Sequence, residues 1–176
     1  NDFEYLGLVN EVPMTLIARP TMPAANYADL AKWLDANKGK INLANAGLGL
    51  VHGFAGPIGG RCAMPHGEVC GTLLSEVTRR TIEVLFEDAA RQHVALEKFG
   101  RAGALLSGRS AHSMREDCLS LVATLEGWVE RFQMPRLSRY GMTVDDLPRI
   151  LDKSNGKNSP VTLNRAQMSA ILTARL

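Results

Sequence analysis

The fold of this chain is decided by two short segments, Val51-His52-Gly53-Phe54-Ala55-Gly56-Pro57-Ile58-Gly59-Gly60 and Pro65-His66-Gly67-Glu68-Val69-Cys70. Each segment contains a histidine followed by a glycine, and the two histidines lie fourteen positions apart. Imidazole nitrogen is a common ligand of Zn²⁺, Fe²⁺ and other first-row metals. Two helices joined by a tight turn can bring such a pair together. His52 and His66 are therefore predicted to form half of a metal site.

The two segments resemble the iron-containing (group III) alcohol dehydrogenases, a group that includes the maleylacetate reductases. The similarity continues through Met134-Pro135-Arg136-Leu137 and Tyr140-Gly141-Met142-Thr143 and ends in Asn158-Ser159-Pro160-Val161-Thr162-Leu163. It covers about residues 43–176, which correspond to the helical C-terminal domain of that family. The resemblance implies a mainly α fold, a helical bundle, with a short α/β appendage at the N-terminus.

The same resemblance implies what His52 and His66 do. In that family the two histidines supply half of a four-ligand metal site, so Fe²⁺ or Zn²⁺ is the expected cofactor. An Asp and another His on an upstream helix supply the other half, and the glycine-rich nucleotide-binding domain is also upstream. Neither part has a counterpart in this sequence. No NAD site, no catalytic residue and no cofactor-binding residue is therefore predicted here.

The front of the chain resembles a different family, the tripartite tricarboxylate solute receptors, which are periplasmic binding proteins with two α/β lobes. The similarity lies in Asp2–Val9, Val12–Arg19 and Asn26–Leu30. The stretch Leu43–Gly49 suits either family and is interpreted as a seam. The prediction is a fusion, with a receptor-like α/β fragment at 1–47 and a dehydrogenase-like helical domain at 48–176. The alternative is one diverged family with chance similarity at the front.

Composition narrows the functional classes. The 176 residues suffice for one domain with a small appendage. A net charge of +2 argues against nucleic-acid binding, and the chain has no apolar run long enough to span a membrane. Three cysteines form no disulfide-scaffold spacing, and the sequence begins at Asn1 without a signal-like segment. A reducing, cytoplasmic location is expected.

Local patterns predict the elements. Residues 3–9 and 12–18 are rich in β-branched and aromatic residues and predict strands. A helix is expected from Asn26 to about Asn37, and another from about Leu48 onward. The glycines and proline of residues 56–60 favour a turn between helices.

From Gly67 onward the apolar spacing predicts helices to the end of the chain. Helix starts are indicated by Ser113 with Glu116, by Thr143 with Asp146, and by Asn164. The predicted buried positions form four groups along the chain: Val69, Cys70, Leu73, Leu74 and Val77; Val94, Phe99 and Leu105; Cys118, Leu121, Val122, Leu125, Trp128, Val129 and Phe132; and, near the end, Leu147, Ile150, Leu151, Met168, Ile171 and Leu172.

Two other interpretations of the histidines stay open. His52 and His66 could be inherited residues that no longer bind anything. Alternatively, Cys62 and Cys70 could join them in a four-ligand zinc site, although the spacing matches no zinc finger and family-like helices would bury Cys70 in the core. His93 lies among polar residues, as does His112, and both are expected to be exposed.

The preferred functional hypothesis is a truncated, fused relative of an iron-containing alcohol dehydrogenase without self-sufficient catalysis. The alternative is metal-dependent oxidoreductase activity completed by oligomerisation or by a partner chain. Strand edges within residues 3–19 would be unpaired in one copy and invite pairing with a second copy. The expected partner is therefore another copy of this chain, bound through its N-terminal segment, with no nucleic acid and no membrane.

Overall fold

The computed structural model describes residues 29, 32–33, 36, 49–108, 113–156 and 158–176. The chain divides into two compact units, Asn1–Asn45 and Ala46–Leu176. In the first unit the four described residues are helical and lie within the helix predicted from Asn26 to Asn37. The strands predicted at 3–9 and 12–18, and the domain boundary predicted after residue 47, lie outside the described residues.

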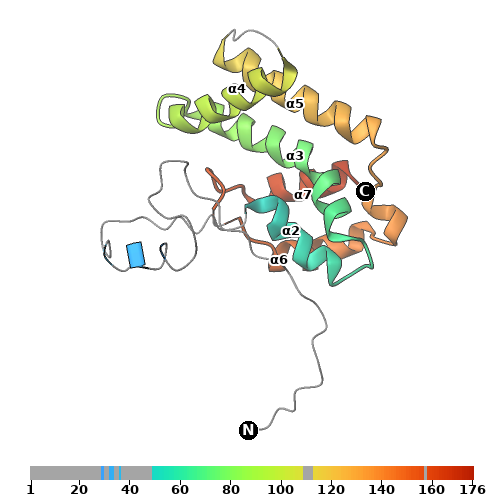
Figure 1. Cartoon of the computed structure of the whole chain (residues 1–176). Helices are drawn as coiled ribbons and strands as arrows, with labels where there is room; N and C mark the ends of the chain where they lie inside the picture. The colour runs from blue at the N-terminus through green and yellow to red at the C-terminus, as the bar shows by residue number, and fades with distance from the viewer. Residues whose placement is uncertain (1–28, 30–31, 34–35, 37–48, 109–112, 157) are drawn as a thin grey trace. The chain divides into compact units, whose positions relative to one another are not determined.

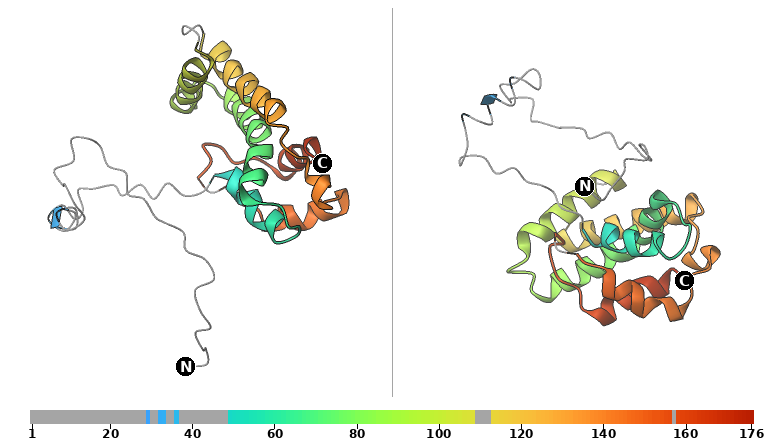
Figure 2. Two further views of the ribbon diagram at one scale, coloured as in Figure 1. Left: turned by 45° about the vertical axis from the view of Figure 1, so that its right-hand side comes forward. Right: turned by 90° about the horizontal axis from the view of Figure 1, so that it is seen from below.

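The second unit is a bundle of helices. Its elements are α2 (Leu50–Gly59), α3 (His66–Glu87), α4 (His93–Ser107), α5 (Met114–Arg131), two 3₁₀ turns (Leu137–Tyr140 and Val144–Asp146), α6 (Leu147–Lys153) and α7 (Arg165–Ala174). The long helix α3 connects the α4–α5 pair with the group formed by α2, α6 and α7 (Figures 1 and 2). Over the described ranges no residue is in a strand, so the predicted mainly α class is confirmed for this unit.

Two hydrophobic clusters follow from this arrangement. The first half of α3 packs with α2, α6 and α7 around the fully buried side chains of Phe54, Ile58, Leu73 and Leu172. The second half of α3 packs with α4 and α5 around Leu85, Leu96 and Cys118. None of the helices that the structure describes has the length and apolarity needed to cross a membrane.

The contact between α4 and α5 corrects the predicted buried face of α4. Val94 is 65% exposed and Leu105 is 73% exposed, while the buried positions are Leu96, Gly100 and Gly103. A Cβ atom on Gly103 would stand 1.9 Å from the carbonyl oxygen of Asp117. The backbones of the two helices are in close contact at this point. Glycines therefore lie on the contact face of α4, which a search for large apolar residues does not identify.

The turn predicted at residues 56–60 is also wrong. Helix α2 continues through Gly59, with Ile58 fully buried, and the Gly60 N–H donates to the Gly56 carbonyl at 3.0 Å. The glycines and Pro57 of this segment are compatible with a turn, but the helix is favoured because it buries Ile58. The connection to α3 instead runs from Gly60 to Pro65.

The predicted helix starts are confirmed at three positions. The Glu116 N–H donates to Ser113 Oγ at the start of α5, and the Gln167 N–H donates to the Asn164 side chain at the start of α7. The Thr143–Asp146 pair forms a capping box at the predicted position, where it begins the 3₁₀ turn Val144–Asp146 that leads into α6.

Most of the predicted buried positions of α3, α5, α6 and α7 are confirmed: Val69, Leu73, Val77, Cys118, Leu121, Val122, Leu125, Leu147, Ile150, Leu151, Ile171 and Leu172 are buried. The prediction is wrong for the positions at the edges of these faces. Leu74, Trp128 and Phe132 are exposed, and Cys70, Val129 and Met168 are only partly buried.

Candidate metal centre

The first turns of α2 and α3 present the two histidines. The Leu50 N–H donates to Ser159 Oγ at 3.1 Å, which fixes the start of α2. One residue beyond His52, Gly53 lies against the backbone of Asn155, where a Cβ atom would stand 1.8 Å from the Asn155 carbonyl oxygen. The glycine in the His-Gly pair therefore lets α2 approach the segment after α6. This approach sets the position of His52.

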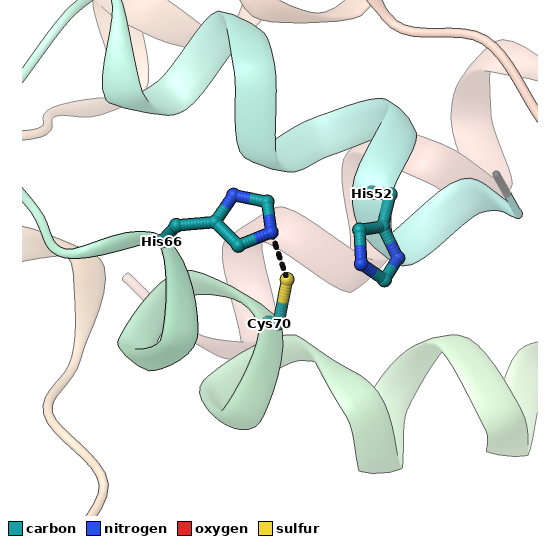
Figure 3. Close-up of side chains that lie close together, drawn as sticks. All are labelled: His52, His66 and Cys70. Carbon is teal, nitrogen blue, oxygen red and sulfur yellow. Dashed lines mark hydrogen bonds between the residues drawn. The ribbon is translucent and has the colours of Figure 1, made fainter. Parts of the chain in front are cut away.

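Helix α3 presents His66 and Cys70 on one face. Its N-cap is Pro65, which has extended backbone angles, and His66 is its first residue. Residues four apart on a helix lie one above the other, so Cys70 follows His66 on the same side. Figure 3 shows both side chains pointing into the space between α3 and α2, where the His52 ring lies.

The three side chains form a compact group of possible metal ligands. The rings of His52 and His66 have centroids 5.3 Å apart and are tilted by 48°. The Sγ of Cys70 lies 3.5 Å from Nε2 of His66. One donor atom from each residue can be chosen so that all three lie within 4.8 Å of one another.

The group lies at the boundary between solvent and core. His52 and His66 are exposed, whereas Cys70 is partly buried against the first hydrophobic cluster. This burial raises the pKa of the Cys70 thiol above its usual value. A cavity of about 440 Å³ extends from His52 and Cys70 along α3, with Leu74, Val77 and Phe99 in its wall. An ion held by the group would therefore have water on one side and an apolar hollow on the other.

The residues present fit a divalent metal ion. A tetrahedral site with metal–nitrogen distances of about 2.0–2.1 Å and metal–sulfur distances of about 2.3 Å has donor atoms about 3.5 Å apart. The contact between His66 and Cys70 already has this separation. His52 needs a shift of only about 1 Å to complete a three-donor face, which its exposed ring allows.

Cys62 does not take part, and the four-ligand zinc interpretation is wrong in that residue. The Cys62 side chain is buried, its thiol donates to the Ile58 carbonyl at 3.4 Å, and it is absent from the ligand group. Cys70 is not buried in the core as family-like helices predict, but lies at the edge with its sulfur toward His66. His93 is exposed as predicted, and His112 lies outside the described residues.

A second polar contact involves the first turn of α3, and the sequence patterns do not predict it. The Tyr140 hydroxyl donates to the carboxylate of Glu68, two residues after His66. This hydrogen bond raises the pKa of Tyr140. It ties the first turn of α3 to the 3₁₀ turn at Leu137–Tyr140, across 72 residues of sequence. Both residues lie in segments that carry the family resemblance, but nothing in the sequence indicates that they pair, because the pairing depends on the tertiary fold.

Comparison with solved structures places this arrangement among known folds. The chain is similar to a structure described as 1,3-propanediol oxidoreductase, with 24% sequence identity and a TM-score of 0.61. The match covers 73% of this chain and 33% of that one, so the chain spans about a third of that protein's length. At this identity the likeness shows the fold alone. Comparison with curated protein sequences gives no match.

Comparison with family profiles is more specific. The profile described as the Fe-containing alcohol dehydrogenase family, C-terminal, matches residues 3–176. The match extends to residue 3, through the segment that resembles solute receptors, and the receptor resemblance stays a prediction. A match over nearly the whole sequence, together with the helical fold, shows that this chain belongs to the Fe-containing alcohol dehydrogenase family and corresponds to its C-terminal region.

Proposed function

We propose that this chain provides the metal-binding helical part of a metal-dependent alcohol dehydrogenase, with His52 and His66 as two of the metal ligands. We further propose that these 176 residues alone do not carry out the complete reaction. Family membership supports the reaction class, and the absence of a recognisable nucleotide-binding motif from the sequence supports the second part.

One observation carries the proposal. The rings of His52 and His66 come from two different helices and have centroids 5.3 Å apart. Both rings are exposed, so neither is held in place as part of the core. Inherited but idle histidines would keep the same positions in this fold, so the two interpretations differ in whether a metal ion binds to the group.

The chemistry follows from the types of side chain. A bound divalent ion would polarise the oxygen of an alcohol and favour loss of its proton. Neutral imidazoles of His52 and His66 would hold the ion. The apolar wall formed by Leu74, Val77 and Phe99 would exclude water from the side where an alcohol's carbon chain lies. In the family a nicotinamide would accept the hydride of the alcohol, and the proposal assigns no residue of this chain to nicotinamide binding.

Calorimetric titration of the metal-free chain with Zn²⁺, and with Fe²⁺ under anaerobic conditions, tests the proposal. We expect one ion per chain and at least about tenfold weaker binding in His52→Ala and in His66→Ala, since even indirect ligand partners contribute that much. His93→Ala is the matched control, because His93 is an exposed histidine at the start of α4 outside the ligand group. Equal affinities in all four proteins would refute the assignment.

Three further expectations remain proposals. If the chain is a fusion at the seam, the gene should join receptor-like and dehydrogenase-like sequence in one reading frame. Sequencing across the codons for residues 43–49 in independent isolates tests this, and dehydrogenase-like sequence on both sides would contradict it.

Self-association through residues 3–19 predicts a molar mass above 19.1 kDa by light scattering, and a monomer after removal of those residues. A cytoplasmic location agrees with the three free cysteines.

A further inference from the structure

We propose that Cys70 is a third metal ligand, which makes the site a two-imidazole, one-thiolate centre that prefers Zn²⁺ to Fe²⁺. The inference rests on the proposed function in one respect, namely that His52 and His66 bind a metal. It goes beyond that function because the resemblance assigns no role to Cys70.

The distance is the first argument. The Sγ of Cys70 lies 3.5 Å from His66 Nε2, which equals the donor separation of about 3.5 Å expected on the edge of a tetrahedral zinc site. The dashed contact in Figure 3 shows that the sulfur is on the side of α3 that faces His52. No rearrangement of the backbone is needed to bring the sulfur to a metal held by the two histidines.

The second argument is the difference between this thiol and the other two. Cys62 and Cys118 are buried, and their thiols donate to the carbonyls of Ile58 and Leu96. Cys70 has its contact with an imidazole nitrogen and is accessible in part. The three cysteines thus divide into two core residues and one residue at the histidine pair.

The third argument is the number of ligands. Three protein ligands with one open position form the usual arrangement of a catalytic zinc ion, whereas four close the site. His52, His66 and Cys70 provide three, from two helices whose relative position is fixed by the core. Thiolate is a soft donor that favours zinc, and zinc also binds more tightly than Fe²⁺ to mixed nitrogen and sulfur sites.

Binding of the metal requires the Cys70 thiol to give up its proton. The S–H bond breaks, a metal–sulfur bond forms, and the proton passes to the buffer. No electron is transferred in this step, so no oxidant or reductant is needed.

Titration of the metal-free full chain with Co²⁺ tests the inference, because a thiolate ligand gives a near-ultraviolet charge-transfer band that imidazole ligands do not. We expect this band in the wild-type chain, its loss in Cys70→Ser, and its retention in the controls Cys62→Ser and Cys118→Ser. We also expect at least about tenfold weaker Zn²⁺ binding in Cys70→Ser. Zn²⁺ should displace the bound Co²⁺, whereas the same concentration of Fe²⁺ should not.

X-ray absorption at the zinc edge of the wild-type chain provides a measurement that does not depend on the folding of any variant. We expect one sulfur scatterer at about 2.3 Å beside nitrogen scatterers at about 2.0–2.1 Å. Binding that depends on His52 and His66 without a sulfur scatterer or a charge-transfer band would overturn the role of Cys70 and leave the proposed function intact. Binding that is independent of both histidines would overturn the two together.

Discussion

The backbone of Gly53 lies so close to that of Asn155 that a Cβ atom on the glycine would stand 1.8 Å from the asparagine carbonyl oxygen. Gly53 follows His52 directly, so this contact links the packing of α2 with the position of a proposed metal ligand. The His-Gly pair combines a donor side chain with the small residue that lets its helix approach a neighbour.

We expect Gly53→Ala to destabilise the fold and weaken metal binding together. The added methyl cannot be accommodated without moving backbone, and overpacking of this kind costs about 1–3 kcal/mol. Gly56→Ala in the same helix is the control, because nothing lies within 4 Å of its Cβ position, and alanine should stabilise the helix by about 1 kcal/mol. Urea denaturation and zinc titration of both variants make the comparison. Equal stability in the two variants would show that α2 is not held against Asn155.

Gly103→Ala should separate α4 from α5. Its Cβ atom would stand 1.9 Å from the Asp117 carbonyl oxygen, whereas the Cβ of Gly127, on α5, would have no neighbour within 4 Å. We expect a loss of about 1–3 kcal/mol for Gly103→Ala. Gly127→Ala should gain about 1 kcal/mol from helix propensity. Thermal denaturation followed by circular dichroism measures both, and a neutral Gly103→Ala would contradict the close helix contact.

Asp146 should stabilise the fold only above acidic pH. The Arg61 guanidinium hydrogen-bonds to its carboxylate and, with the Thr143 N–H, lowers the pKa of Asp146. A lowered folded-state pKa means that the contribution is fully present above the unfolded pKa of about 3.9 and is lost as the pH falls through the folded value. The melting temperature of Asp146→Asn should therefore be lower than that of the wild type at pH 7. The two should converge in strong acid.

Asp152→Asn is the control for this dependence. Asp152 pairs with Arg165 on the surface, where both side chains are more than half exposed. Exposed ion pairs of this kind contribute little to folding stability, so we expect the melting temperature of Asp152→Asn to equal that of the wild type at every pH. A pH-independent difference between Asp146→Asn and the wild type would show that the charge of Asp146 is not what stabilises the fold.

We expect no nicotinamide reduction by the 176-residue chain with short alcohols and added Fe²⁺ or Zn²⁺. Holding two reactants in contact can supply about 7–11 kcal/mol of the barrier, and no residue of this sequence is predicted to hold the nicotinamide. Absorbance of the reduced nicotinamide measures the reaction. Turnover that disappears in His52→Ala would restore the hypothesis of a self-sufficient enzyme.

The helices were predictable from sequence where the signal is local. Apolar spacing identifies α3, α5 and α7, and the caps at Ser113 and Asn164 mark the starts of α5 and α7. The buried face of α4 was not predictable in this way, because Gly100 and Gly103 pack without a large side chain. The end of α2 was missed for a related reason, since burial of Ile58 depends on α3 and α6 rather than on residues 56–60.

In the candidate site, too, local sequence patterns predict some residues, whereas other contacts depend on the tertiary fold. His52 and His66 are predictable because their spacing with glycine resembles a family pattern. The contact of Cys70 with His66 follows from the helix, which places residues four apart on one side, whereas the approach of His52 to that side depends on the packing of α2 against α3. The hydrogen bond between Glu68 and Tyr140 is not predictable from the segments that contain them, because it joins parts of the chain 72 residues apart through the tertiary fold.

The central claim is that His52 and His66 together hold one metal ion, and elemental analysis after gel filtration tests it most directly. Wild-type chain, the double variant His52→Ala/His66→Ala and the control His93→Ala are incubated with zinc, separated from free metal and analysed for zinc per chain. The account predicts about one zinc in the wild type and in His93→Ala and almost none in the double variant, since two of three donors are lost. Equal zinc in all three proteins would contradict it.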